Sequence, residues 1–380
     1  MTEIRPFTLE VPQDQIDDLH RRLDQARWPE CECVDDWSQG VPLAALRALV
    51  EHWRHAYDWR RCEARLNALG QFVTEIDGLD IHFIHVRSPY EGAKPLILTH
   101  GWPGSVIEFL EVIGPLADPV AHGGRAEDAF HVVVPSLPGY GFSGKPGRTG
   151  WGVPKVGEAW AELMRRLGYE RWFAQGGDWG AIVTTVMGAQ APQGLAGIHT
   201  NMPIARILPE DREESDPAVV AALAAGARYN AVDSGYSKIQ STRPQTIGYG
   251  LVDSPVGLAG WIYEKMWSWT DNQGAPEQAL SRDTMLDNIM LYWLSASGAS
   301  AARMYWESFG TIGRGGFEVQ LPAGISTFPR EITKAPRKWA ERTLRNIVYW
   351  NDCEHGGHFA AWEQPRIFVD EVRKCFALMR

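Results

Sequence analysis

The sequence predicts an α/β fold with a mostly parallel, doubly wound sheet, a helical cap and an N-terminal segment. Apolar strands alternate with amphipathic helices up to about residue 202, which is typical of a parallel sheet covered on both faces. Beyond that point the alternation stops, and the chain becomes helical and rich in Trp, Tyr and Met before strands resume. We expect four regions: 1–75, the N-terminal segment; 76–202, the first part of the sheet domain; 203–318, the cap; and 319–380, the second part.

The individual elements follow from local periodicity. Residues 11–28 place apolar side chains from Ile16 to Ala26 at helical spacing, and a second helical stretch follows near 42–69. The expected strands are FVTEI, LDIHFIHV, PLILTH, HVVVPS, GISTF and RNIVYW. Helices are expected at SVIEFLEVIGPL, at VGEAWAELMRRLG and over the final residues 364–379. A ligand site is expected at the carboxyl edge of this sheet, beneath the cap.

Composition excludes several classes of function. A net charge of -10 and a pI near 5.6 give a surface that repels nucleic acid and anionic lipid. The start MTEIRPFTLEVPQ has no apolar stretch of a signal peptide, so we expect a cytoplasmic protein without a membrane anchor. The five cysteines are scattered without paired spacing and predict neither disulfides nor a zinc site: Cys31, Cys33, Cys62, Cys353 and Cys375.

The stretch FAQGGDWGAIVTT, residues 173–185, is the first candidate for chemistry. It reads as a strand, a tight glycine turn and a helix start, with Asp178 at the apex. In the α/β-hydrolase pattern Gly-x-Ser-x-Gly, that apex holds a serine nucleophile. The simpler interpretation is that Asp178 only caps the following helix, because Asp is a favoured N-cap residue.

The motif HGWPGS, residues 100–105, directly follows the strand PLILT. A loop at this position can direct backbone N–H groups at the apex of the nucleophile turn. We expect the amides of Trp102 and Trp179 to form an oxyanion hole there. For His100 a structural role, with its ring bonded to backbone, is the preferred interpretation.

The base and its supporting acid are expected in the last quarter of the chain. His358 lies in GGHFAAWEQP between the strand RNIVYW and the last helix, and Glu331 lies in STFPREI after the strand GISTF. The chain order Asp178, Glu331, His358 matches the nucleophile, acid, base order of this fold. His355 is a weaker candidate for the base. Asp352 and Glu354 compete with Glu331, although they lie on the same loop as the histidine.

An aspartate at the apex changes the chemistry. A carboxylate displaces a leaving group from saturated carbon and forms an alkyl ester, which water activated by the base then hydrolyses. An epoxide oxygen leaves as an alkoxide and needs a proton donor, for which tyrosine is suited. Residue chemistry does not choose among the tyrosines of the cap, which are Tyr229, Tyr236, Tyr249, Tyr263, Tyr292 and Tyr305.

The chain resembles the microsomal-type epoxide hydrolases along nearly its whole length. The resemblance is carried by RPFTLEVP, ARWPE, HGWPGS, VPSLPGYGFSGKP, GGDWG, FPREI and GGHFAAWEQP, in that order. It implies Asp178 as nucleophile, His358 as base and Glu331 as its orienting acid. It also implies Tyr236, in the segment SGYSKIQSTRP, and Tyr305, in ARMYWES, as lid tyrosines. Substrate contacts are then expected from Trp102, Trp179 and Phe359, and the N-terminal segment is expected to wrap the core and the cap.

We therefore expect an epoxide hydrolase that converts a bulky or aryl epoxide to a vicinal diol. Its partner is the small-molecule substrate, a homo-oligomer is possible, and neither a metal nor an organic cofactor is expected. Two alternatives remain open. A haloalkane dehalogenase shares the Asp nucleophile and can use a Trp like Trp179 to hold halide, but the N-terminal segment and FPREI count against it. A catalytically silent receptor with this fold would have no need of a water-activating base.

Overall fold

The computed structural model describes residues 3–312 and 317–379. Residues 313–316, inside the range expected for the cap, lie outside the described residues, as do 1, 2 and 380. The described chain forms a nine-stranded sheet in the order β1-β2-β3-β5-β4-β6-β7-β8-β9. The neighbours from β5 through β9 pair in parallel, and β1, β2 and β3 add an antiparallel edge. The α/β fold with a mostly parallel sheet is thus confirmed.

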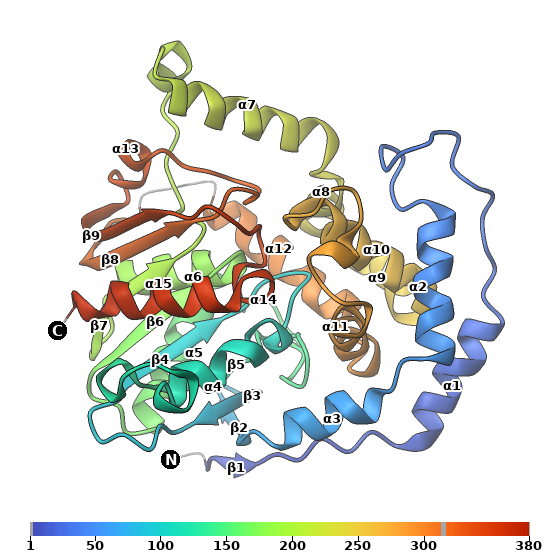
Figure 1. The fold of residues 1–380 in the computed structure, drawn as a ribbon, viewed down its shortest axis with the longest axis horizontal. Coiled ribbons are helices and arrows are strands. Elements are labelled where there is room, and N and C mark those ends of the chain that lie inside the picture. Colours follow the sequence, from blue (N-terminus) through green and yellow to red (C-terminus); the bar gives the residue numbers. More distant parts are fainter. Residues whose placement is uncertain (1–2, 313–316, 380) are drawn as a thin grey trace.

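The strands are short, and those in the middle of the sheet are almost fully buried. Their bounds are β1 (Arg5–Pro6), β2 (Gln71–Ile76), β3 (Leu79–Val86), β4 (Lys94–Thr99), β5 (Phe130–Pro135), β6 (Trp172–Gly176), β7 (Leu195–Thr200), β8 (Val319–Thr327) and β9 (Leu344–Asp352). Helices cover both faces, with α4 (Leu110–Ala117) and α15 (Pro365–Ala377) on one and α5 (Val153–Arg166) and α6 (Trp179–Gln190) on the other (Figure 1). This two-sided cover explains why the parallel strands read as continuous apolar runs.

The N-terminal segment joins the sheet to the cap. Strand β1 pairs with β2, after which α1 (Gln13–Asp24), α2 (Leu43–His55) and α3 (Trp59–Asn67) run around the molecule, as Figure 1 shows. Helix α2 packs against two helices of the cap. The single helical stretch expected near 42–69 is wrong in one respect, because Asp58 caps a new helix by accepting a hydrogen bond from the amide of Arg60.

The cap lies between β7 and β8 and is helical throughout its described elements. Those elements are η4 (Pro209–Glu213), α7 (Pro217–Val232), α8 (Gly235–Thr242), α9 (Pro244–Asp253), α10 (Pro255–Trp269), η5 (Pro276–Gln278), α11 (Arg282–Leu294) and α12 (Gly298–Ile312). Helices α8 to α12 sit beside the carboxyl ends of the strands, whereas α7 stands away from the sheet (Figure 1). The cap therefore covers the edge where the motif-bearing loops emerge.

Other elements also differ from expectation, among them the two-residue strand β1, which was not expected. The stretch SVIEFLEVIGPL begins as a 3-10 helix, η1 (Val106–Phe109), before α4 continues it. Strand β7 was not expected, since Gly197 interrupts its apolar pattern. Two short 3-10 turns, η2 (Val120–His122) and η3 (Ala126–Asp128), precede β5, and α13 (Arg337–Ala340) and α14 (Ala360–Glu363) flank β9. No helix in the described part of the chain is long and apolar enough to cross a membrane.

Candidate active site

Asp178 occupies the turn between β6 and α6 in a strained backbone conformation, with φ 50° and ψ -126°. Although it stands at the N-cap position, its side chain makes no capping hydrogen bond. Instead, its Oδ1 accepts a hydrogen bond of 2.7 Å from the amide of Trp102. A Cβ atom on Gly101 would lie 2.1 Å from that oxygen, so the loop that follows β4 can approach Asp178 only because this residue is glycine. The geometry favours a functional carboxylate over a simple cap.

His358 bridges two carboxylates. Its Nε2 lies 3.3 Å from Oδ2 of Asp178, and its Nδ1 lies 2.6 Å from Oε1 of Glu331. The two loops that carry His358 and Glu331 are held together by a parallel bridge between Arg330 and Gly357. The same Oε1 also accepts a hydrogen bond from the amide of Ile332, which fixes the carboxylate behind the ring. The structure thus brings together three residues that are far apart in sequence.

The charges around His358 decide its protonation. Burial disfavours the charged ring, but the carboxylates of Glu331 and Asp178 outweigh burial and raise the pKa of His358 well above its ordinary value. The imidazolium is therefore the favoured form while both carboxylates are ionised. Loss of either negative charge would lower the pKa of this histidine.

The competing candidates lie elsewhere. His355 and Glu354 are exposed, and Asp352 accepts a hydrogen bond from Thr327. His100 is buried, where its Nδ1 contacts the carbonyl of Gly101 at 3.0 Å and its Nε2 accepts from the amide of Leu137. Burial lowers the pKa of His100 to about 4. His100 is therefore a neutral histidine that holds the HGWPGS loop in place.

Two tyrosines of the cap meet the tryptophan of this loop. The ring of Tyr236 stacks on Trp102 with centroids 4.7 Å apart, and the ring of Tyr305 meets Trp102 edge-on at 5.9 Å. Both tyrosines are buried, and their rings lie 5.8 Å apart. Burial, the neighbouring tyrosine hydroxyls and the charge of Asp178 raise the pKa of each well above its ordinary value, so both are held as phenols.

The other cap tyrosines have different contacts. Tyr292 donates to the carbonyl of Gly104, Tyr263 donates to Glu277, and Tyr249 is 71% exposed. Tyr236 and Tyr305 thus differ from Tyr249 because they are buried. They differ from Tyr292 and Tyr263 because they contact Trp102. Neither the hydrophobic pattern of the sequence nor helix propensity predicts which cap tyrosines contact Trp102.

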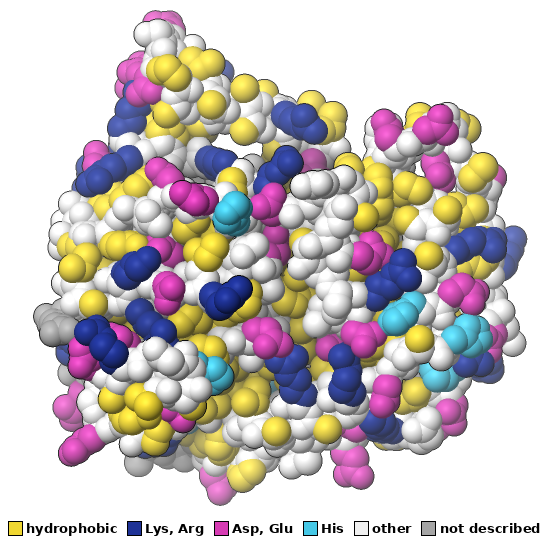
Figure 2. Space-filling model, viewed as in Figure 1, with side chains coloured by type: hydrophobic (Ala, Val, Ile, Leu, Met, Phe, Trp, Pro, Cys, Tyr) yellow, Lys and Arg dark blue, Asp and Glu magenta, His cyan; other side chains and the backbone are white. Residues whose placement is uncertain are grey.

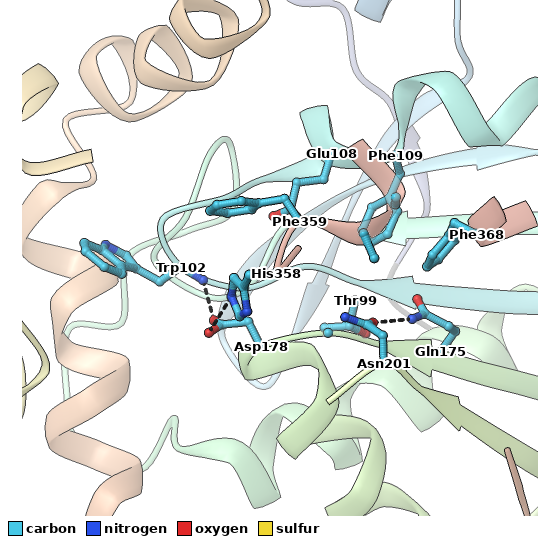
Figure 3. A pocket seen from close by; sticks show the side chains of 14 residues that line it. Thr99, Trp102, Glu108, Phe109, Gln175, Asp178, Asn201, His358, Phe359 and Phe368 are labelled. Carbon is cyan, nitrogen blue, oxygen red and sulfur yellow. Dashed lines mark hydrogen bonds and ion pairs between the residues drawn. The ribbon is translucent and has the colours of Figure 1, made fainter. Parts of the chain in front are cut away.

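Figure 3 shows the cavity at the nucleophile, with Asp178, His358, Trp102 and Phe359 at one end and Gln175 and Asn201 at the other. It has a volume of about 10 Å³, close to the space that one ordered water needs. Phe359 lines this cavity beside His358, whereas the ring of Trp179 lies against Tyr305 and is not among the residues that line it. The Trp179 amide begins α6 next to Asp178 but, among the described residues, only the Trp102 amide donates to that carboxylate.

Comparison with known proteins identifies the family. Residues 4–109 match the family Epoxide hydrolase N terminus, and residues 94–228 match the alpha/beta hydrolase fold family. Epoxide hydrolase 1 of Oryctolagus cuniculus is 36% identical over 409 residues, covering 99% of this chain and 89% of its own. The chain belongs to the microsomal-type epoxide hydrolases.

Two further relatives of this epoxide hydrolase agree. A protein of Stigmatella aurantiaca (strain DW4/3-1), whose name also contains the words epoxide hydrolase, is 57% identical over 379 residues, covering 99% of this chain and 86% of its own. The solved structure of Aspergillus niger epoxide hydrolase superposes with a TM-score of 0.90 at 33% identity, covering 100% of this chain and 97% of that one. The α/β-hydrolase fold and the hydrolase class are thus confirmed. In the described residues, no cluster of His, Cys, Asp and Glu could hold a metal ion.

Glu108 is a feature of the site that our sequence analysis missed. It lies on η1 and lines the cavity together with Asp178 and His358 (Figure 3). Its carboxyl group occupies the space beside Gly104, where a Cβ atom would lie 1.5 Å from its Oε1. Burial raises the pKa of Glu108 to about 8. The spacing of Ser105 and Glu108 matches a capping box, a signal that could have drawn attention to this residue.

The raised pKa predicts how Glu108 affects stability. Because the folded state holds this proton more tightly than the unfolded chain, whose pKa is near 4.5, the free energy of unfolding should fall as pH rises from about 4.5 to 8. Glu108→Gln should lose less stability than wild type over that window. Urea unfolding at several pH values measures the difference, with Glu111→Gln, at an exposed position on α4, as the control. Parallel curves for wild type and Glu108→Gln would contradict the prediction.

Proposed function

We propose that this epoxide hydrolase opens its substrate through a covalent ester on Asp178. The observation that carries the proposal is the continuous line of contacts from the Trp102 amide through Asp178 and His358 to Glu331, beneath Tyr236 and Tyr305. These contacts place a nucleophile, a base and its orienting acid close to two proton donors.

In the first step, Oδ2 of Asp178 attacks an epoxide carbon, because Oδ1 is already engaged by the Trp102 amide. The C–O bond of the ring breaks, and the departing oxygen takes a proton from a lid tyrosine. Tyr236 and Tyr305 suit this role because their raised pKa values keep them protonated until an alkoxide, which is far more basic, forms. An alkyl ester on Asp178 and a free hydroxyl on the substrate result.

The second step depends on a change of charge. Esterification removes the negative charge of Asp178, which is one of the two charges that raise the pKa of His358. His358 then loses its proton to solvent and becomes a base, with Glu331 still holding Nδ1. It activates a water that attacks the ester carbonyl, and the Trp102 amide stabilises the resulting oxyanion. The diol leaves, and the carboxylate returns.

The aromatic residues around Asp178 and His358, rather than the cavity of about 10 Å³ itself, support a bulky or aryl-substituted epoxide as the substrate class. Trp102, Trp179, Tyr305 and Phe359 present aromatic faces or edges near the nucleophile. Aromatic rings bind apolar and aryl groups through burial and through edge-to-face contact. The epoxide oxygen would lie toward the cap, beside the hydroxyl groups of Tyr236 and Tyr305.

The product formed from chosen substrates tests the function. Purified enzyme is offered styrene oxide, a bulkier aryl epoxide and a chloroalkane, and diol and released halide are measured. Diol from both epoxides without halide from the chloroalkane is the expected result. Halide without diol would instead show a dehalogenase, and no product at all would contradict the proposed function.

A further inference from the structure

A third tyrosine contacts the buried proton donor. The hydroxyl of Tyr229 lies 2.8 Å from the hydroxyl of Tyr236. Tyr229 belongs to the last turn of α7, while Tyr236 lies on α8. Tyr236 is only 6% exposed, and Tyr305 only 2%. Tyr229 is partly exposed, and Val232 on the same turn is 76% exposed. Tyr229 therefore connects the buried hydroxyl of Tyr236 to a solvent-facing part of the cap.

The proposed reaction leaves Tyr236 without its hydroxyl proton. When Tyr236 protonates the alkoxide, its O–H bond breaks and a phenolate remains in a buried site. Over the same turnover His358 gives one proton to solvent and regains one from the hydrolytic water. The substrate gains the proton that Tyr236 lost, so Tyr236 must recover one from solvent before the next turnover. With bound substrate beside its ring and only 6% exposure, this hydroxyl has little direct contact with water.

We propose that Tyr229 relays a proton from solvent to Tyr236. The hydroxyl of Tyr229 donates to the phenolate oxygen, its O–H bond breaks as the Tyr236 O–H bond forms, and water returns a proton to Tyr229. The two steps move one proton inward and change no other bond. This inference rests on the proposed function. Among the described residues, the hydroxyl of Tyr229 contacts that of Tyr236 and no contact with Asp178 is found, so Tyr229 is a positioning residue that acts through Tyr236.

The charges facing this pair are compatible with the relay. The ammonium group of Lys265 lies 4.7 Å from the ring centroid of Tyr236, and it pairs with Asp233 and Glu264. A buried cation at that distance stabilises a transient phenolate. Burial raises the pKa of Tyr229 above its ordinary value, and the negative charges of Asp233 and Asp178 raise it further. These two carboxylates therefore oppose the effect of Lys265. Esterification of Asp178 removes one of these negative charges in the same step that forms the phenolate.

The position of α7 provides the access to water that a relay needs. Figure 2 shows this helix standing off the body of the molecule, with apolar side chains along it. Arg228 and Asn230, on either side of Tyr229, are exposed. A proton that reaches the hydroxyl of Tyr229 then has to cross only the single contact of 2.8 Å to the hydroxyl of Tyr236.

The test is Tyr229→Phe, which removes one oxygen atom and keeps the ring. After rapid mixing with an aryl epoxide, we expect an ultraviolet phenolate signal that persists in the variant and decays quickly in wild type. Turnover should fall about 10- to 100-fold, the effect of losing a hydrogen bond to a charged group. A small acid added to the buffer should restore part of the rate in the variant and leave wild type unchanged. Tyr249→Phe, an exposed tyrosine on α9, is the matched control and should behave as wild type.

Three further variants separate the possible failures. Tyr236→Phe should abolish the phenolate signal, which assigns it. Tyr229→His keeps a ring donor and should recover part of the turnover, whereas a purely structural role predicts no recovery. The relay would be overturned if Tyr229→Phe turned over and lost its phenolate signal as fast as wild type. If wild-type enzyme still formed diol in a reaction that requires Asp178, the proposed function would remain intact. Absence of diol from wild-type enzyme would overturn the proposed function itself.

Discussion

Asp178→Ala is expected to lower diol formation from an epoxide by about 10⁴-fold or more, because it removes the atom that forms the covalent bond. The fold should survive, since the side chain makes no capping hydrogen bond and alanine leaves the glycines of the turn unchanged. Initial rates of diol formation, measured with circular dichroism spectra of both proteins, provide the comparison.

The control for this variant is Asp352→Asn, which changes a carboxylate that hydrogen-bonds Thr327 and does not contact His358. Its activity should remain within a few-fold of wild type. Diol that persists in Asp178→Ala would contradict the covalent mechanism, and water would then have to attack the epoxide directly with His358 as base.

His358→Gln should separate the two chemical steps. Asp178 keeps its carboxylate and the Trp102 amide, so the ester should still form. Hydrolysis should slow by about 10²- to 10⁴-fold, because no base remains to activate water. The mass of the denatured protein after incubation with an epoxide should therefore increase by the mass of one substrate molecule.

His355→Gln is the matched control, since it makes the same substitution three residues earlier at an exposed position. It should turn over normally and show no adduct. An adduct that maps by peptide mass to a residue other than Asp178 would contradict the assignment of the nucleophile. Wild-type turnover in His358→Gln would contradict its role as base.

The sequence predicted the parallel strands and their alternation with helices because buried parallel strands are continuously apolar and covering helices have one apolar face. It also predicted which loops carry Asp178, Glu331 and His358, because each motif directly follows a strand, and parallel strands end at one edge. It did not predict β7 or the 3-10 start of the helix after HGWPGS. Gly197 weakens the apolar pattern of β7. The 3-10 helix carries Glu108, whose position beside Gly104 is a tertiary contact that the sequence pattern does not show.

The tertiary structure decided the contacts among residues that lie on different elements. The sequence by itself determined a doubly wound sheet, a cap of helices, a carboxylate at the nucleophile turn and a set of tyrosines in the cap. Only the fold determined that Tyr236 and Tyr305 face Trp102, and that Tyr229 reaches Tyr236 from α7. The physical reason is that periodicity reports which face of an element is buried, whereas packing between elements selects the side chain that each buried group contacts.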